Sequence, residues 1–490
     1  MDRLYKSVLH LGNLFKPQLF ELFLFNSTTM ISYHLNKATE TICSLWSWWW
    51  AGSNKKLDVV DGAVLTVSVA VLAILWYLRT SRKGTAPWPP GPRGLPVVGY
   101  LPFLGSNLHH SFAELAHLYG PIFKLWLGNK LCVVLSSPSL AKQVVRDQDI
   151  IFANRDPPVA AFAYTYGGLD IAWSPYGSYW RNLRKVFVRE MLSNTSLEAC
   201  YPLQRSEVRK AITNAYSKIG TPMDIGQLSF QTVVNVTLSS LWGNTPEAHN
   251  DGKIGAEFRE AASEITELLG KPNISDFFPT LAGFDIQGVE RQMKRAFLSA
   301  EQDILVGGTD TTATMVEWVM AEMIRNPVIM TRAQEELTNV VGMGSIVEES
   351  HLPKLQYMDA VIKESLRLHP ALPLLVPKWS KPRLHRIHRF GIVLLEFKPE
   401  RFLSEPGRWD YTGNNFQYLP FGSGRRICAG IPLAERMIIY LLASLLHSFN
   451  WQLPEGEDLD LSEKFGIVLK KRTPLVAIPT KRLSSSDLYL

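Results

Sequence analysis

The first strong feature of the hydrophobic pattern is a long apolar run over residues 59–78. It is long enough to cross a bilayer as one helix. Trp76 and Tyr77 suit the membrane interface, and three basic residues follow within 79–83. We predict a single-pass transmembrane anchor, and a slight lysine and arginine asymmetry leans towards a cytosolic C-terminal side. A cleaved signal peptide is disfavoured, because the run is long, lies far from the N-terminus and has no small-residue cleavage site.

Two segments flank this anchor. Residues 1–58 form an N-terminal leader of unknown role, in which Trp46 and Trp48–Trp50 suit a headgroup layer and Met30 is an alternative start. Residues 79–100 form a basic and then Pro/Gly-rich hinge. Its dense proline excludes helix and favours a stiff, extended connector, although a generic linker has the same composition.

After residue 100 the pattern mixes amphipathic helices with short strands. Residues 122–127 alternate and residues 131–135 are apolar, so both predict strands. The other predicted segments are helices over 140–147, 288–295, 355–367 and 431–449, and a loop over 157–166. Because strands are few and early while long helices dominate later, we predict a mainly α fold with small β-sheets, in one catalytic domain over 101–490.

Composition narrows the class of protein. The 490 residues are 46% hydrophobic and 11% aromatic, which suits a folded protein with a large core. The net charge of +6 is mild and is not gathered into a stripe, so nucleic acid is not an expected partner. The four cysteines are far apart and contain no CxxC, which disfavours a disulfide framework or a structural zinc site and suits a reducing compartment.

One cysteine, Cys428, lies in a run of glycines and arginines directly before the predicted helix at 431. Pro432 suits the first turn of that helix. The positive end of the helix dipole then faces the sulfur, which favours thiolate over thiol. The glycines allow N–H groups to approach the sulfur and a flat ligand to lie against the main chain. For a lone cysteine, a buried thiol at a helix start is the simpler interpretation.

The stretch from 421 to 430 has the pattern F-x-x-G-x-R-x-C-x-G. This pattern resembles the haem-thiolate loop of cytochromes P450. The resemblance implies that Cys428 is the axial iron ligand of haem b and that Arg426 pairs with a haem propionate. The other cofactor-binding residues implied by the loop are Phe421, Gly424 and Gly430.

Trp180 and Arg184 are four residues apart at the start of a predicted basic helix, so both project from one face. Taken alone, they fit a core tryptophan and a surface cation. Their W-x-x-x-R spacing is similar to the P450 element whose side chains contact haem propionates. The resemblance implies the same role here.

Gly307 and Gly308 interrupt an otherwise helical pattern, and each costs about 1 kcal/mol relative to alanine. A loose helix start with threonine and aspartate capping explains them about equally well. The run G-G-x-D-T resembles the oxygen-binding element of P450s. It implies a gap that admits O2 over the iron and a proton relay through the catalytic residues Asp310 and Thr311.

Glu364 and Arg367 are three apart in a predicted helix, and Arg401 follows in Pro399–Phe402. E-x-x-R by itself usually marks a solvated ion pair that contributes little. In P450s the three equivalent residues form a buried network that holds the cysteine loop. The resemblance therefore implies a structural role rather than a catalytic one.

The motifs appear in the family's order over roughly residues 87–480, and they are most similar to plant microsomal P450s that oxidise terpenoids and flavonoids. This implies a mono-oxygenase that inserts one atom of O2 into a C–H bond of a hydrophobic plant secondary metabolite, at the endoplasmic reticulum membrane. No GxGxxG follows a strand, so electrons are expected from NADPH through a separate cytochrome P450 reductase. Substrate-pocket positions suggested by the resemblance are Phe162, Tyr164, Val306, Leu374 and Leu375.

Two stretches are shorter than in the family, near 296–301 and 378–396. Before Gly307, relatives place another helix and the first half of the long central helix. In the second stretch they carry a strand hairpin and a helix, whereas this chain has a basic, poorly patterned link. Lys378 stands near where relatives often place a histidine or arginine for a propionate. A missing hairpin would open one wall of the substrate pocket.

Three functional hypotheses follow. The intact cysteine loop and the Asp310–Thr311 pair favour an active mono-oxygenase. The two short segments favour a haem-binding P450-like protein without activity. A rearrangement without oxygen input predicts loss of the acid–alcohol pair, which is present.

Overall fold

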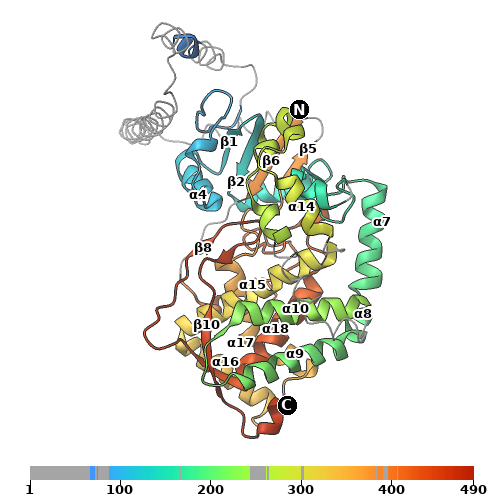
Figure 1. The fold of residues 1–490 in the computed structure, drawn as a ribbon, viewed down its shortest axis with the longest axis vertical. Helices are drawn as coiled ribbons and strands as arrows, with labels where there is room; N and C mark the ends of the chain where they lie inside the picture. Colours follow the sequence, from blue (N-terminus) through green and yellow to red (C-terminus); the bar gives the residue numbers. More distant parts are fainter. Residues whose placement is uncertain are drawn as a thin grey trace. The chain divides into compact units, whose positions relative to one another are not determined.

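The computed structural model describes residues 67–71, 74, 88–165, 167–242, 261, 264–298, 303–380, 383–389, 396–404 and 407–490. Residues 88–100 and 104–490 belong to one compact unit (Figure 1). In the predicted anchor, residues 67–71 and 74 are helical, and their large apolar side chains are exposed. The leader over 1–58 and the hinge residues 79–87 lie outside the described residues.

The second half of the predicted hinge lies against strand β1 (Ile122–Leu127). The Lys124 N–H donates to the Pro90 carbonyl at 2.8 Å, and the Lys124 ammonium lies 5.3 Å from the centre of the Trp88 ring. At Gly91 the Lys124 carbonyl leaves no room for a side chain. This part of the hinge is therefore held on the catalytic unit.

The largest sheet has the strand order β1-β2-β6-β5-β3. β1 and β2 (Lys130–Leu135) form an antiparallel pair, as the alternating and apolar runs predict. β2 pairs in parallel with β6 (Arg383–Arg389). β5 (Lys378–Ser380) joins β6 to the short strand β3 (Asn154–Arg155), and both of these pairings are antiparallel.

Strands β5 and β6 lie in the link that the sequence pattern leaves undefined. The expectation of an unpatterned link is corrected here, because the two strands pair with one another and β6 pairs with β2. Strand formation depends on the neighbours that a segment meets more than on its own alternation. The pairing of β6 with the apolar strand β2 therefore decides the structure of this segment, although its own hydrophobic pattern is weak.

Two smaller sheets complete the β structure of the described residues. One has the order β4-β10-β7 and the other pairs β8 with β9. Their bounds are Met223–Asp224 (β4), Phe449–Gln452 (β7), Glu463–Lys464 (β8), Lys470–Lys471 (β9) and Val476–Lys481 (β10).

Helices dominate the rest of the described chain, which confirms the predicted mainly α class (Figure 1). The α-helices are α4 (Leu108–Tyr119), α5 (Pro138–Lys142), α6 (Val159–Tyr164), α7 (Ser178–Val186), α8 (Asn194–Ala199), α9 (Tyr201–Ser217), α10 (Ile225–Trp242), α13 (Ile274–Phe277), α14 (Val289–Leu298), α15 (Asp303–Arg325), α16 (Pro327–Val341), α17 (Gln356–Leu368) and α18 (Ile431–Ser448). Short 3-10 turns include η7 (Pro399–Phe402) and η8 (Gly424–Arg426).

Helix α6 corrects the loop that the sequence predicts over 157–166. Three of its six residues are alanine, the best helix former, and Pro158 precedes its first turn. Ala160, Ala161 and Tyr164 are buried against α14. Local propensity and tertiary packing therefore agree on helix.

The core lies around α15, which packs against α10, α16, α17 and α18 (Figure 1). Trp318 of α15 is fully buried there. Among the helices that the structure describes, α18 alone is long and apolar enough to cross a membrane. Since 61% of its apolar window is buried in the protein, it is a core helix.

Candidate functional site

The cysteine loop is shaped by backbone conformations that only glycine tolerates well. Gly424 has φ +68°, and the Val145 carbonyl oxygen occupies the space that a side chain there would need. The Cys428 N–H donates to the Phe421 carbonyl at 3.0 Å, which closes the loop. Gly430 is the N-cap of α18, and Pro432 lies in its first turn. The predicted loop-then-helix geometry is thus present at Cys428.

The thiol of Cys428 is exposed although the residue lies deep in the fold, and all three described cysteines are free. Burial raises its pKa above the ordinary value, while the Gly430 N–H and the charge of Arg184 act in the opposite direction. The Gly430 N–H at the start of α18 thus acts in the predicted direction, although burial has the larger effect on the pKa of the thiol. A metal ion at the sulfur would add a positive charge that favours the thiolate.

Trp180 and both predicted propionate arginines lie together. The guanidinium of Arg426 is 4.1 Å from the centre of the Trp180 ring, and that of Arg184 is 5.6 Å from it. Trp180 is buried and donates its indole N–H to the Ile171 carbonyl at 2.9 Å. Arg426 is also buried and donates its Nε–H to the Ala153 carbonyl at 2.6 Å. The W-x-x-x-R element and the cysteine loop therefore form one cluster.

Arg425, next to Arg426, lies at the surface rather than in the cluster. It is exposed and pairs with Asp149 at 3.1 Å. Of the two neighbouring arginines of the loop, only Arg426 is buried in the cluster, as the assignment of Arg426 to a propionate requires. A salt bridge at this exposure adds little to stability.

Two further cations join Arg426, namely Arg155 of β3 and Lys378 of β5. Burial and the neighbouring charge of Arg426 lower the pKa of Arg155 to about 9, and its Nε has no partner among the described residues. Burial and the charge of Arg155 lower the pKa of Lys378 to about 7. Burial and Arg184 lower the pKa of Arg426 to about 10. This crowding of buried cations fits a ligand with carboxylates, and the residues therefore fit haem with its two propionates.

Sequence reasoning singled out Lys378 from its position but missed Arg155. The segment Phe152–Arg155 contains one arginine in a short apolar stretch, with no spacing that links it to residue 426. Only the pairing of β3 with β5, which sets Arg155 opposite Lys378, brings the two together.

On α15, Gly307 and Gly308 have open space where a side chain would lie, with no described atom within 4 Å apart from the helix's own backbone and the chain neighbours. The Thr311 hydroxyl donates to the Gly307 carbonyl at 3.0 Å and the residue is accessible. Asp310 is buried, and its Oδ1 accepts an ion pair from Lys470 of β9 at 2.8 Å. Its Oδ2 has no partner in the described part of the chain. Lys470 is a site residue that no sequence pattern indicated.

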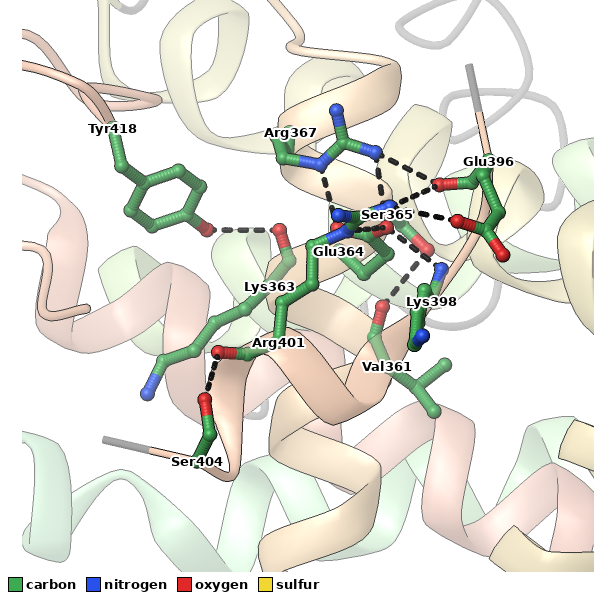
Figure 2. A network of polar contacts seen from close by, with 10 residues as sticks. All are labelled: Val361, Lys363, Glu364, Ser365, Arg367, Glu396, Lys398, Arg401, Ser404 and Tyr418. Carbon is green, nitrogen blue, oxygen red and sulfur yellow. Dashed lines mark hydrogen bonds and ion pairs between the residues drawn. The ribbon is translucent and has the colours of Figure 1, made fainter. Parts of the chain in front are cut away.

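Figure 2 shows the network around Glu364, which is fully buried on α17. Arg367 binds its carboxylate through two N–H groups, at 2.6 and 2.9 Å. Arg401 of η7 donates at 3.2 Å and the Lys398 N–H at 2.7 Å. Both guanidiniums also reach the Glu396 carbonyl. The structure thus brings the three predicted network residues onto one carboxylate.

The predicted pocket residues differ in exposure and in backbone conformation. Phe162 is half exposed, whereas Tyr164 is buried in the cluster with Trp173 and Met293. Leu374 is buried, and Leu375 has a left-handed backbone with φ +53°. The side chain of Val306 lies outside the described residues. The pocket assignment therefore stays a prediction.

A family model described as cytochrome P450 matches residues 89–302, 298–382 and 395–478. The match is broken at the two stretches that the sequence analysis identifies as short. The chain is 33% identical to a flavonoid 3'-monooxygenase of Crocosmia x crocosmiiflora, over 86% of this chain and 97% of that protein. It is 34% identical to geraniol 8-hydroxylase of Catharanthus roseus, over 85% and 98%.

Two other comparisons agree. Carnosic acid synthase of Salvia pomifera is 32% identical, over 85% of this chain and 99% of that protein. A zebra fish cytochrome P450 solved with progesterone superposes with a TM-score of 0.60 at 23% identity, over 76% of this chain and 99% of that one, which shows the shared fold. With the cysteine loop and the family match in agreement, the chain belongs to the cytochrome P450 family and is a haem-thiolate mono-oxygenase that takes haem b and electrons from a reductase.

Proposed function

We propose that the chain hydroxylates a hydrophobic secondary metabolite of the terpenoid or flavonoid class. The names of its relatives support this class, since one acts on flavonoids and another on geraniol. The observation that carries the assignment is the exposed, free Cys428 at the start of α18, beside Arg184 and the cluster of buried cations.

In this proposal the sulfur of Cys428 would hold the haem iron, and the loop residues Phe421, Gly424 and Gly430 would shape the surroundings of that sulfur. When bound, haem b supplies the activation of O2, which the protein's own side chains cannot perform. Arg426, Arg184 and Trp180 bind and orient the propionate edge, and Arg155 with Lys378 adds two cations there. The glycine pair of α15 leaves room for a ligand against the helix.

Proton delivery is assigned to Asp310 and Thr311. Lys470 holds Oδ1 of Asp310 at 2.8 Å, so that Oδ2 is left to exchange a proton. The Thr311 hydroxyl, fixed by the Gly307 carbonyl, is the second group of the relay. Lys470 is a positioning residue in this scheme.

The cellular arrangement is part of the same proposal. Residues 59–78 anchor the protein in the endoplasmic reticulum membrane, the hinge follows over 79–100, and the catalytic domain over 101–490 faces the cytosol. The described helical residues at 67–71, with their exposed valines, support an anchor there. NADPH–cytochrome P450 reductase supplies the electrons.

The first experiment is a carbon monoxide difference spectrum of the reduced, purified chain. A thiolate-type Soret shift that is present in the wild type and lost in Cys428→Ala supports the site. If the two proteins give the same spectrum after haem reconstitution, the assignment of Cys428 is overturned. Substrates are then screened among terpenoids and flavonoids, with reductase and NADPH present.

A second candidate is a haem-binding protein without turnover, which the broken family match favours. The alignment with the flavonoid 3'-monooxygenase extends over 497 positions. This chain contributes 86% of its 490 residues, or about 421, so about 76 positions of the alignment have no counterpart in it. We propose that these positions fall mainly at the two breaks, near 298–302 and 383–394.

A chimera separates the two candidates. The relative's segments are inserted at these breaks, and turnover is compared with that of the natural chain at equal haem content. Turnover by the natural chain excludes the second candidate. Turnover by the chimera alone, with both proteins giving the thiolate spectrum, establishes that the chain holds haem but cannot oxidise substrate.

A further inference from the structure

Three polar side chains meet where the first helix of the catalytic unit touches the last part of the chain. His109 and His110 are the second and third residues of α4, and Glu463 begins β8 (Figure 1). Nε2 of His109 lies 2.8 Å from Oε2 of Glu463, and Nε2 of His110 lies 3.1 Å from the same oxygen. The haem-site residues described above do not include any of these three.

Their spacing is close to that of a metal-binding set. The three potential ligand atoms all lie within 4.8 Å of one another. In a tetrahedral zinc site with bonds of about 2.0–2.1 Å, neighbouring ligand atoms are about 3.3 Å apart. The two imidazole–carboxylate distances of 2.8 and 3.1 Å are within about 0.5 Å of this value, so modest shifts of the side chains would bring the three groups around one ion.

Neighbouring residues surround two of these groups, His109 and Glu463. The ring of His109 is 94% buried, stacks on Phe465 at 5.3 Å, and has no partner for Nδ1 among the described residues. The 2.8 Å contact with the Glu463 carboxylate places a ring proton on Nε2, so metal binding at Nε2 requires that this proton be released or moved to the unpartnered Nδ1.

On its other side Glu463 faces His369, whose Nδ1 is 3.8 Å from Oε1. Nε2 of His369 lies 2.7 Å from Oε1 of Glu322, and its ring stacks on Trp318 at 3.9 Å. Outer groups commonly support the carboxylate ligands of a metal site. The buried pair of His369 and Glu322 lies on that side of Glu463 and contributes a charge interaction rather than a hydrogen bond.

We propose that His109, His110 and Glu463 bind a divalent transition-metal ion of the zinc class. Two imidazoles and one carboxylate suit zinc better than magnesium or calcium, which prefer oxygen ligands alone. The His110 side chain is 60% exposed, so a water molecule completes the coordination from that side. The ion joins α4 to β8, which are 354 residues apart in the chain, and its role is structural.

The test uses the full-length, haem-loaded protein after dialysis against EDTA. Zinc chloride is titrated by calorimetry, and thermal unfolding is followed by circular dichroism with and without zinc. We expect one ion per chain, a higher Tm with zinc and an unchanged carbon monoxide difference spectrum. X-ray absorption at the zinc edge should show nitrogen and oxygen ligands with bonds of about 2.0–2.1 Å.

Variants locate the ion. His110→Ala removes an exposed ligand without disturbing the core, and we expect it to weaken zinc binding by about 100-fold or more. The matched control is His117→Ala, which removes an exposed histidine from the same helix and should bind zinc as the wild type does. His369→Gln should weaken binding by about 10- to 100-fold, since it acts through Glu463.

Two results would overturn the proposal. One is a wild type that binds no stoichiometric zinc at micromolar concentrations. The other is equal zinc affinity in wild type and His110→Ala, which would place the ion elsewhere and leave the cluster as a hydrogen-bonded contact only. Neither result depends on turnover, so the mono-oxygenase assignment is tested separately.

Discussion

The two sides of the haem site differ in how completely they are built. On the cysteine side, helix α17 and turn η7 are joined by close polar contacts centred on the buried Glu364, and Tyr418, just before the cysteine loop, donates to the Lys363 carbonyl of α17 (Figure 2). On the opposite side, α15 carries Asp310 and Thr311, but the family match restarts at residue 298, directly before that helix. The second break, between 382 and 395, lies in the link that leads towards η7.

This difference distinguishes the residues needed to bind haem from those needed to oxidise a substrate. The cysteine side draws on α7, α17, η7 and the loop before α18, together with Arg155 and Lys378, and all of these lie inside matched segments. The substrate side in P450s draws on the helix before the oxygen motif and on a strand hairpin and a helix in the second stretch. The expected loss of the hairpin is corrected, because β5 and β6 pair as antiparallel strands there, although the family match is broken over 383–394. Haem binding is therefore expected to be more robust in this chain than substrate oxidation.

The largest effect is expected at Cys428. Cys428→Ser replaces a soft thiolate ligand by a hydroxyl, so the thiolate-type carbon monoxide band should vanish completely. The control is Cys200→Ser, which changes a free, half-buried cysteine outside the loop and should keep the band. A retained band in Cys428→Ser would show that the cysteine side does not hold the iron as proposed.

Glu364→Gln tests the stability of the cysteine side. Removing the charge of a fully buried carboxylate leaves Arg367 without a carboxylate partner and Arg401 with the exposed Glu396 alone, which should cost about 3–5 kcal/mol in the free energy of unfolding. The measurement is urea unfolding followed by circular dichroism. Glu400→Gln is the matched control, because its pair with Arg332 is exposed and should contribute less than about 1 kcal/mol. Equal losses in the two variants would contradict the proposed role of the network.

Asp310→Asn tests the opposite side. Loss of the acid should reduce turnover by about 100-fold, or about 2.7 kcal/mol in barrier, while the carbon monoxide spectrum stays unchanged. Lys470→Met should also lower turnover, since it frees Oδ1 of Asp310 from its 2.8 Å ion pair. Asp359→Asn removes an exposed acid of α17 and is the control. Turnover that survives in Asp310→Asn would remove Asp310 from the relay.

How much could be predicted from the sequence depends on whether a feature forms within one segment or between distant segments. The mainly α class, the β1–β2 pair, the helix after Cys428 and the axial ligand follow from periodicity and from short motifs with fixed spacing. What could not be predicted depends on contacts between distant segments. Arg155 reaches Lys378 only through the pairing of β3 with β5, and Lys470 reaches Asp310 only through the position of β9.

Two local features depend on burial and packing that the sequence pattern does not show. Burial outweighs the helix dipole in setting the pKa of Cys428, and burial is not visible in the loop's own residues. The run of alanines in α6 has high helix propensity, but the nearby prolines and aromatic residues had suggested a loop. In both cases the deciding factor was packing against residues far away in the sequence.

The smallest predicted effect concerns the pH dependence of stability through Glu317 of α15, the helix that carries Asp310 and Thr311. Glu317 of α15 is buried and accepts a hydrogen bond from the Leu475 N–H at 2.8 Å. Burial, aided by the negative charge of Asp224, raises its pKa from 4.5 to about 6. Because the folded state binds this proton more tightly, the stabilisation is complete below pH 4.5 and is lost as the pH rises through 6, by about 2 kcal/mol.

Glu317→Gln keeps the acceptor for Leu475 but carries no charge at any pH. The variant should match the wild type near pH 4.5 and be more stable by about 2 kcal/mol at pH 7.5. Urea unfolding at several pH values measures this, and Glu335→Gln, at an exposed acid of α16, should leave the pH dependence unchanged. If Glu317→Gln keeps the wild-type slope between pH 5 and 7, the charge of Glu317 does not limit the stability of α15. The stability of α15 would then not depend on pH through Glu317. The two sides of the haem site would differ only in the two broken segments.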